Sequence, residues 1–373
     1  MKRRFCALLA LVMLLSGRAS CASEPLSVQA RGAVLIDAAS GRVLFGQNEN
    51  ARFAMASTTK IMTALLALEN CELSETVTAS QNAAGVGGTS IYLRQGETLT
   101  MQQMLYGLLL RSGNDAAVAI AEHVAGDVDA FCAMMNARAA QLDADAHFQN
   151  PHGLDQNGHE ASALALARIF REAMRREDFR RITGTAEATI PWDGNDFQRV
   201  LSNKNRLLST YPGATGGKTG YTSRAGRCLV FSAERDGLHL IGVVLSCPDW
   251  FGEAERMLDY GFANYRLEEP LEAGQTACRA AVWGGMDQTV EAVAGEALAA
   301  AVRQGETWRV EYEFGAGVRA PIEQGETIGE AVLYVEGEAV ARAPLLAARV
   351  VKRRTLFNVL ARAFERWPLF ART

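Results

Sequence analysis

The order of hydrophobic and polar positions predicts a strand pair near the start of the chain and a set of helices after it. Apolar residues fill 33–36 and 43–45 around the polar stretch 37–41, which is typical of two strands joined by a turn. Residues 58–68 are apolar on nearly every face of a helix, so this helix should run through a core. The same periodicity predicts further helices at 101–110, 115–124, 131–142 and 162–174.

A second strand pair follows these helices. Residues 227–232 and 238–246 are largely apolar, and Glu234-Arg235-Asp236-Gly237 between them is a hairpin signal. A further helix is expected at 253–260. Because strands at both ends enclose the helices, we expect an α/β (α+β) domain in which helices pack on a mixed sheet.

The pattern changes after about Pro270. Short alternating strands are expected at 308–312, 331–335 and 338–343, and glycine-containing turns such as Gln324-Gly325 separate them. This part of the sequence therefore predicts a small all-β domain behind the first one.

The first 22 residues have the pattern of an export signal. Three basic residues precede the apolar run 5–15, and Ser20-Cys21-Ala22 offers small residues for cleavage after Ala22. The apolar run is too short to span a bilayer. A lipoprotein signal ending at Cys21 is the other interpretation, but Arg18 stands where that signal needs an apolar residue.

The last segment is basic and amphipathic. Residues 349–373 carry seven basic residues against the single acid Glu365. The basic residues lie on one face of a predicted helix over 351–373, which favours binding to a membrane surface. A terminal helix packed on its own protein is the alternative. The other face is apolar and carries Leu356, Phe357, Val359, Leu360, Ala363, Phe364 and Trp367.

Charge and cysteine content exclude several classes of function. A net charge of −4 gives no general attraction to nucleic acid, so no nucleic-acid partner is expected. The histidines lack metal-ligand spacing, so neither a metal nor another cofactor is expected. Without Cys-x-x-Cys spacing, the cysteines left after signal removal should be mostly small buried hydrophobes, with at most one or two incidental disulfides. These cysteines are Cys71, Cys132, Cys228, Cys247 and Cys278.

Two short motifs place serine, lysine and asparagine where acyl transfer needs them. In Ser57-Thr58-Thr59-Lys60 the lysine follows the serine by one turn on the same helix face. Burial would lower the lysine pKa, so that a neutral amine could accept the serine proton. Ser112-Gly113-Asn114 lies at the break between two predicted helices and can direct a hydroxyl and an amide into a cleft. Taken alone, each motif is also compatible with an ordinary helix cap.

A third motif, Lys218-Thr219-Gly220, ends a glycine-rich stretch that lets a substrate backbone lie close. Its lysine offers a cation for a carboxylate. Gly217-Lys218-Thr219 also imitates the end of a phosphate-binding loop. Pro212 stands where the first glycine of that loop would be, so we reject nucleotide binding.

Around these motifs the chain resembles the low-molecular-mass D-alanyl-D-alanine carboxypeptidases, the DD-peptidase penicillin-binding proteins. The resemblance covers about 29–265, and more loosely the β-domain and terminal helix. It implies a DD-peptidase/β-lactamase-like catalytic domain. The domains expected are a signal peptide 1–22, the catalytic domain 23–268, a β-rich domain 269–350 and a membrane-anchoring amphipathic helix 351–373. The matching segments are 56–64, 96–117, 150–154 and 217–226.

The resemblance implies a serine-type carboxypeptidase that removes the terminal D-alanine from peptidoglycan pentapeptide stems. In the implied mechanism Ser57 attacks the carbonyl between the two terminal D-alanines, and Lys60 accepts its proton. Ser112 passes a proton to the departing D-alanine. Water then hydrolyses the acyl-enzyme, which β-lactam inhibitors trap. The implied location is the outer face of the bacterial cytoplasmic membrane, to which the exported enzyme is bound peripherally.

The same resemblance implies how the substrate is held. Asn114 orients the peptide, and Lys218 and Thr219 hold the terminal carboxylate beside Gly220. The backbone N–H groups of Ser57 and Tyr221 form the oxyanion hole.

Two positions depart from the family pattern. Trp250-Phe251 stands where members often have an arginine before the phenylalanine, so a second cation is missing or comes from elsewhere. Ala165 replaces an aspartate common at a helix start.

Three other functions are alternatives to the carboxypeptidase. They are a β-lactamase, a DD-endopeptidase that cuts cross-links, and a scaffold that binds wall peptide without turnover.

Overall fold

The computed structural model describes residues 26–365. A five-stranded sheet joins the two ends of the catalytic domain, because β1 (Gly32–Asp37) pairs antiparallel with β12 (Leu238–Leu245). The strand order is β10-β11-β12-β1-β2, with neighbours antiparallel throughout. The other strands are β2 (Val43–Gln47), β10 (Ala214–Thr222) and β11 (Gly226–Arg235). Both predicted strand pairs are therefore confirmed, and β10 lies at the sheet edge.

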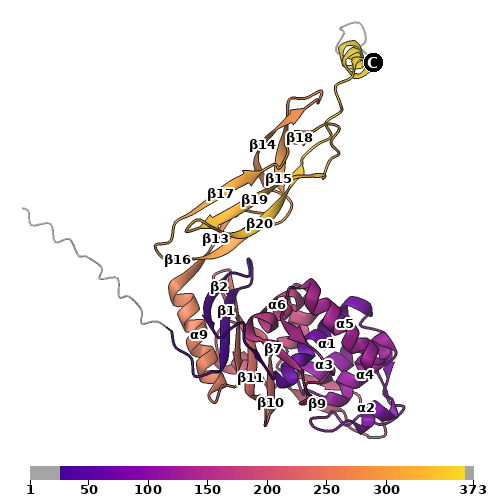
Figure 1. Ribbon diagram of the computed structural model, residues 1–373. Coiled ribbons are helices and arrows are strands. Elements are labelled where there is room, and N and C mark those ends of the chain that lie inside the picture. Colours follow the sequence, from indigo (N-terminus) through magenta and orange to yellow (C-terminus); the bar gives the residue numbers. More distant parts are fainter. Residues whose placement is uncertain (1–25, 366–373) are drawn as a thin grey trace, which may run out of the picture.

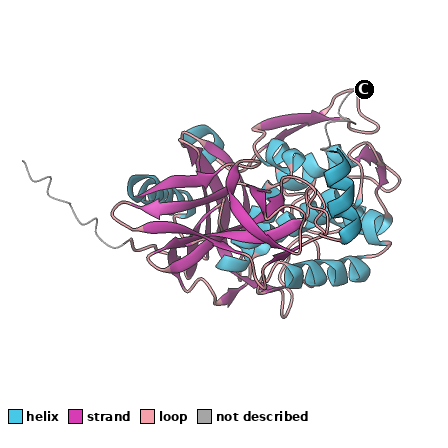
Figure 2. Ribbon diagram, turned by 90° about the horizontal axis from the view of Figure 1, so that it is seen from above, coloured by secondary structure: helices cyan, strands magenta, loops and turns pink. Residues whose placement is uncertain are grey.

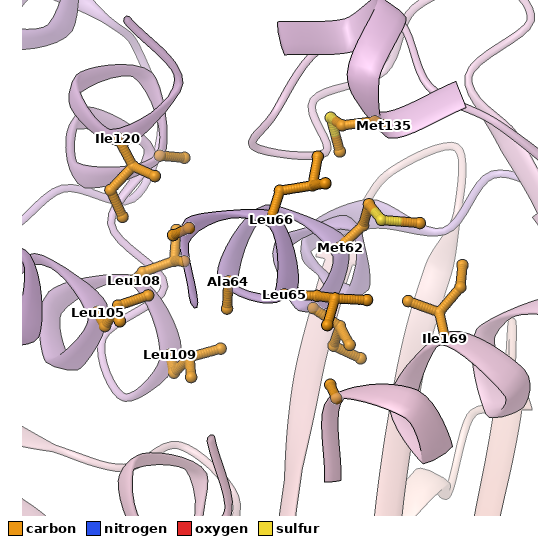
Figure 3. Packing of buried hydrophobic residues seen from close by; sticks show 14 of the residues in the cluster. Met62, Ala64, Leu65, Leu66, Leu105, Leu108, Leu109, Ile120, Met135 and Ile169 are labelled. Carbon is orange, nitrogen blue, oxygen red and sulfur yellow. The ribbon is translucent and has the colours of Figure 1, made fainter. Parts of the chain in front are cut away.

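A layer of helices covers one face of this sheet (Figures 1 and 2). Helix α1 (Lys60–Asn70) runs through its centre, and every residue from Lys60 to Ala67 is buried, as its uninterrupted apolar pattern predicts. Figure 3 shows apolar side chains around α1 on several sides. The surrounding helices are α2 (Gln81–Gly85), α3 (Met101–Leu109), α4 (Asn114–Ala125), α5 (Val128–Gln141), α6 (Ala163–Met174) and α7 (Glu177–Thr183).

The start of α1 differs from the prediction. Ser57 lies not in the α-helix but in the preceding 3-10 turn η1 (Ala56–Thr59). The hydroxyls of Thr58 and Thr59 donate to the carbonyls of Met55 and Ala56, three residues back. Ala56 has a φ of 48°, so the chain turns sharply just before the serine.

Helix α9 (Trp250–Asn264) covers the opposite face of the sheet and packs in a second apolar cluster that includes Phe231 and Leu240. Small two- and three-stranded units surround the helical layer and carry its loops. The remaining elements of this domain are β3 (Arg52–Phe53), β4 (Thr76–Thr78), β5 (Thr98–Thr100), β6 (Ala146–His147), β7 (Glu160–Ser162), β8 (Glu187–Ile190), β9 (Arg199–Ser202) and α8 (Leu207–Thr210).

An all-β domain follows α9 directly, as predicted (Figure 1). Its first strand, β13 (Tyr265–Leu271), runs through the boundary that we place at 268/269 from the sequence. β13 pairs with β16, and the other strands form a sheet ordered β17-β19-β20-β15-β14-β18. Their bounds are β14 (Thr276–Trp283), β15 (Thr289–Ala294), β16 (Leu298–Arg303), β17 (Trp308–Glu313), β18 (Val318–Arg319), β19 (Thr327–Val335) and β20 (Glu338–Ala347).

Polar contacts join the two domains. The guanidinium of Arg42 forms two 2.8 Å bonds with the carboxylate of Glu306, and it also donates to the carbonyl of Ala301. The buried carboxylate of Asp37 accepts a hydrogen bond from the N–H of Ala301. These bonds link the first hairpin to the strand β16 and the turn after it.

The chain continues into the short helix α10 (Leu356–Glu365). Leu356 and Phe357 are each 79% exposed. Among residues 26–365, no helix is long and apolar enough to cross a membrane. The predicted signal peptide and Trp367 lie outside the described residues.

Candidate active site

The side chain of Lys60 joins three separate segments of the chain. Its Nζ lies 3.0 Å from Oγ of Ser57, 2.8 Å from Oδ1 of Asn114 and 2.5 Å from the carbonyl of His152. A neutral amine has two N–H groups and one lone pair. The two N–H groups fit the Asn114 and His152 oxygens, which leaves the lone pair for the hydroxyl proton of Ser57.

The surroundings of Lys60 favour that neutral form. Its side chain is completely buried, and burial lowers its pKa well below the ordinary value. The positive charges of Lys218 and Lys204 lower the pKa of Lys60 further. A lowered pKa makes the neutral amine more accessible, and a neutral amine can act as a base on a serine.

A second serine and lysine form a parallel pair. Nζ of Lys218 donates to Oγ of Ser112 at 3.0 Å and to the carbonyl of Thr219 at 2.8 Å. Burial lowers the pKa of Lys218 to about 7, with a smaller contribution from the charge of Lys204. Ser112 itself has a φ of 66°, a conformation that turns it out of line between α3 and α4.

The residues just after Ser112 are held by hydrogen bonds to a neighbouring loop. The N–H of Asn114 donates to the carbonyl of Thr89, and its amide Nδ2 donates to the carbonyl of Gly87. The buried carboxylate of Asp115 accepts hydrogen bonds from the N–H groups of Ile91 and Leu93. The loop 87–93 therefore fixes the second motif, and Asn114 in turn fixes Lys60.

Strand β10 passes close to Ser57, and this requires Gly220. A Cβ at Gly220 would lie 2.9 Å from the backbone nitrogen of Ser57 and 3.1 Å from the Cβ of Ala56. Thr219 is largely buried, whereas the side chain of Tyr221 is 64% exposed. The strand edge thus brings the backbone of 219–221 beside the serine. Earlier in β10, the pairing with β11 is irregular between Ala214 and Gly216.

A second glycine fits the other side of the serine turn. A Cβ at Gly153 would lie 2.0 Å from the carbonyl oxygen of Ala56, and Gly153 has a φ of 90°. Its N–H donates to Oδ1 of Asn150, which closes the loop that presents the His152 carbonyl to Lys60. Only glycine fits both the φ and the contact.

The residues predicted for the site lie close together here. The sequence analysis did not identify three further groups, which are the His152 carbonyl, Lys204 and Arg111. Motif spacing does not reveal the role of the His152 carbonyl, because a backbone atom has no residue signature, although the matching segment 150–154 contains it. The imidazole of His152 has a pKa lowered to about 3, first by burial and then by Lys60, so it stays neutral. Lys204 and Arg111 add positive charge, and both burial and Arg111 lower the pKa of Lys204. The only sequence signal for Lys204 is its place between Asn203 and Asn205.

Trp250 and Ala165, the two residues that depart from the family pattern, lie in different surroundings. Trp250 begins α9 and packs against Phe251, over whose ring the Arg206 guanidinium lies at 4.6 Å. The second cation is therefore not at position 250. Ala165 is buried in the core, and its N–H is capped by the hydroxyl of Ser162.

The five described cysteines are free thiols, and Cys132, Cys228 and Cys247 are buried. This agrees with the expectation that most of them act as small hydrophobes.

Comparison with known proteins identifies the family. The D-alanyl-D-alanine carboxypeptidase family matches residues 18–249. The chain belongs to this family. The C-terminal domain of penicillin-binding protein 5 matches residues 265–353, which includes every strand from β13 to β20. The sequence prediction of a D-alanyl-D-alanine carboxypeptidase is confirmed in fold and family.

Relatives of this carboxypeptidase match it over nearly the whole length. The D-alanyl-D-alanine carboxypeptidase DacF of Bacillus subtilis is 34% identical over 99% of this chain and 100% of its own. DacD of Salmonella typhimurium is 30% identical over 93% of this chain and 92% of its own. The crystal structure of penicillin-binding protein 5 from Haemophilus influenzae superimposes with a TM-score of 0.75 at 30% identity, covering 88% of this chain and 99% of that one.

Proposed function

We propose that this carboxypeptidase removes the terminal D-alanine from peptidoglycan pentapeptide stems through an acyl-enzyme on Ser57. The observation that carries the proposal is the buried Lys60 amine, whose two other partners are hydrogen-bond acceptors while its third neighbour is the Ser57 hydroxyl. This arrangement supports proton transfer from serine to lysine as the carbonyl is attacked.

The remaining residues take roles that fit their contacts. The N–H groups of Ser57 and Tyr221 stabilise the oxyanion, because the strand β10 lies against the serine turn. When the C–N bond breaks, the proton held by Lys60 passes through the Ser112 hydroxyl to the amine of the leaving D-alanine. The paired Lys218 supports this step by holding Ser112.

The substrate is positioned by the other motif residues. The Thr219 hydroxyl and the charge of Lys218 bind the terminal carboxylate, and Gly220 allows the strand edge to lie against the serine turn. Asn114 orients both the peptide and Lys60. Water then attacks the ester, its proton passes by way of Lys60 to the departing Ser57 oxygen, and the shortened stem leaves.

The contacts of the serine argue against a β-lactamase. Fast hydrolysis of a penicilloyl ester typically needs a water held by a glutamate. Within residues 26–365, the hydrogen-bond partners of Ser57 and Lys60 include no carboxylate. β-Lactams should therefore act as slowly released inhibitors.

Incubation with a synthetic pentapeptide ending in D-Ala-D-Ala tests the main proposal. Mass spectrometry should show loss of one alanine, and Ser57→Ala should abolish it. A protein that leaves the pentapeptide intact but cleaves a cross-linked muropeptide dimer would be an endopeptidase. Rapid turnover of a chromogenic cephalosporin would instead identify a β-lactamase.

We also propose that the protein acts outside the cytoplasm, exported by residues 1–22, and that the helical segment after 350 binds the outer face of the cytoplasmic membrane. Four exposed apolar side chains of α10 support this, namely Leu356, Phe357, Val359 and Leu360. Arg362 donates to the carboxylate of Asp287 and to the carbonyl of Met286. The helix is thus attached to the β-domain through a polar contact, which leaves these apolar residues free for lipid.

A further inference from the structure

Three side chains of types that can ligate a metal meet on the side of the helical layer away from the catalytic serine. The Sγ of Cys71, a carboxylate oxygen of Glu75 and a ring nitrogen of His123 lie within 4.8 Å of one another. They come from three places: the residue directly after α1, the turn before β4, and the last turn of α4. No residue of the catalytic machinery belongs to this cluster.

The ligand types and spacing suit a four-coordinate transition metal. Zinc binds thiolate, imidazole and carboxylate at about 2.0–2.3 Å, so its tetrahedral ligand atoms lie roughly 3.3–3.8 Å apart. The Nε2 of His123 and Oε2 of Glu75 are already 3.0 Å apart. The cluster needs only small side-chain adjustments to reach this geometry.

The carboxylate is already oriented by a backbone contact. The Oε1 of Glu75 accepts a 2.6 Å hydrogen bond from the N–H of Glu72, which leaves Oε2 towards the imidazole. Such outer contacts position metal ligands in proteins. Cys71 is half-buried, whereas the Glu75 and His123 side chains are 41% and 25% exposed. An ion can therefore enter from solvent, and water can complete its coordination.

We propose that Cys71, Glu75 and His123 form a binding site for one divalent transition-metal ion of the zinc class. The ion would join the end of α1 to the end of α4. The opposite ends of these helices carry Lys60 and Asn114, which are hydrogen-bonded to each other. At 1.5 Å per residue, the 11 residues of α1 place the ion about 16 Å from Lys60. Its role is therefore to stabilise the helical layer and not to contact substrate.

Sequence spacing alone does not reveal this site. Cys71 and Glu75 are four residues apart, but His123 follows 48 residues later and reaches them only through the packing of α4. The expectation of no metal from the sequence rested on paired ligand motifs, which this cluster lacks.

Metal titration of the full-length mature protein tests the proposal. After treatment with a chelator, the protein is titrated with Co²⁺ and, separately, with Zn²⁺ in a calorimeter. We expect one equivalent to bind, a near-ultraviolet thiolate-to-cobalt absorption band, and a melting temperature that rises with Zn²⁺ concentration. Cys71→Ser and His123→Ala should remove the band and weaken binding at least about tenfold.

Two controls accompany the titration. One is a substitution of a cysteine outside the cluster, and the other is an acylation assay that reports the catalytic site. Cys278→Ser removes a half-buried thiol in the β-domain, and it should leave binding unchanged. Acylation by a fluorescent penicillin shows that each variant is folded and reports the catalytic site separately. Absence of a one-equivalent site, or equal binding by wild type and Cys71→Ser, would overturn the proposal and leave Glu75 and His123 as a surface ion pair.

Discussion

Lys218 donates a hydrogen bond from its Nζ to the Oγ of Ser112 over 3.0 Å. The same distance separates the Nζ of Lys60 from the Oγ of Ser57. The site therefore contains two serine–lysine pairs whose lysines are buried, one at the start of α1 and one between β10 and the break before α4. Because the charge of Lys218 lowers the pKa of Lys60, the two pairs are also coupled electrostatically.

Ser57 should be the only residue acylated by penicillin, because its hydroxyl faces the buried Lys60 amine and its backbone nitrogen lies beside β10, where the oxyanion would be held. The intact mass of the wild type should rise by one β-lactam, and Ser57→Ala should show no adduct. An adduct that survives in this variant would contradict the assignment.

Lys218→Ala should impair peptides with a free terminal carboxylate more than peptides whose carboxylate is amidated. Loss of one charge-assisted contact costs about 1.5–3 kcal/mol, so the difference in kcat/KM should be about 10- to 150-fold. With both peptides Ser112 loses its hydrogen bond from Lys218. Only the peptide with a free carboxylate also loses the charge that binds this group. Equal losses would assign Lys218 to Ser112 alone.

Lys204→Gln should move the acidic limb of the kcat/KM profile to higher pH. Lys60 acts in its neutral form, so the rate rises as pH passes through its pKa. The charge of Lys204 lowers the pKa of both Lys60 and Lys218, and its removal must raise both. Arg206→Gln is the control, since this exposed cation is not among the causes of either shift. A limb that stays in place or moves to lower pH would contradict this mechanism.

Gly220→Ala should slow acylation by at least about tenfold while the protein stays folded. The new Cβ would lie 2.9 Å from the Ser57 nitrogen, so β10 must move away from the serine and enlarge the oxyanion hole. Gly85→Ala in α2 meets no atom within 4 Å and should react at the wild-type rate. Stopped-flow acylation by a penicillin measures both. Wild-type rates for Gly220→Ala would argue against this oxyanion site.

Deleting the residues after Val350 should release the protein from anionic vesicles and leave hydrolysis of a soluble peptide unchanged. Each large apolar side chain buried at the interface contributes on the order of 1 kcal/mol or more. The basic residues add an attraction that should weaken with salt. Replacing Leu356 and Phe357 by serine should weaken binding without shortening the chain. If the intact mature protein does not bind vesicles, or if the deletion unfolds the catalytic domain, the helix is a packing element.

The sequence by itself determined the main helices, the two hairpins of the catalytic domain and the reacting groups. These helices and strands followed from local periodicity, whereas β14, β15 and β16 were not predicted. The hairpin at Asp236-Gly237 followed from residues that adopt positive φ, as both do here. The three motifs named Ser57, Lys60, Ser112 and Lys218, because acyl transfer needs those functional groups. Each of these signals lies within a few residues of the chain.

Tertiary structure alone decided how the groups meet. The His152 carbonyl reaches Lys60 across 92 positions, and Lys218 reaches Ser112 across 106. The link of Arg42 to Glu306 spans 264 positions. Such contacts depend on how whole elements pack, which local periodicity does not specify. The lowered pKa of Lys60 has the same origin: its sequence supplies the amine, and only the fold supplies the burial and neighbouring charges that make it a base.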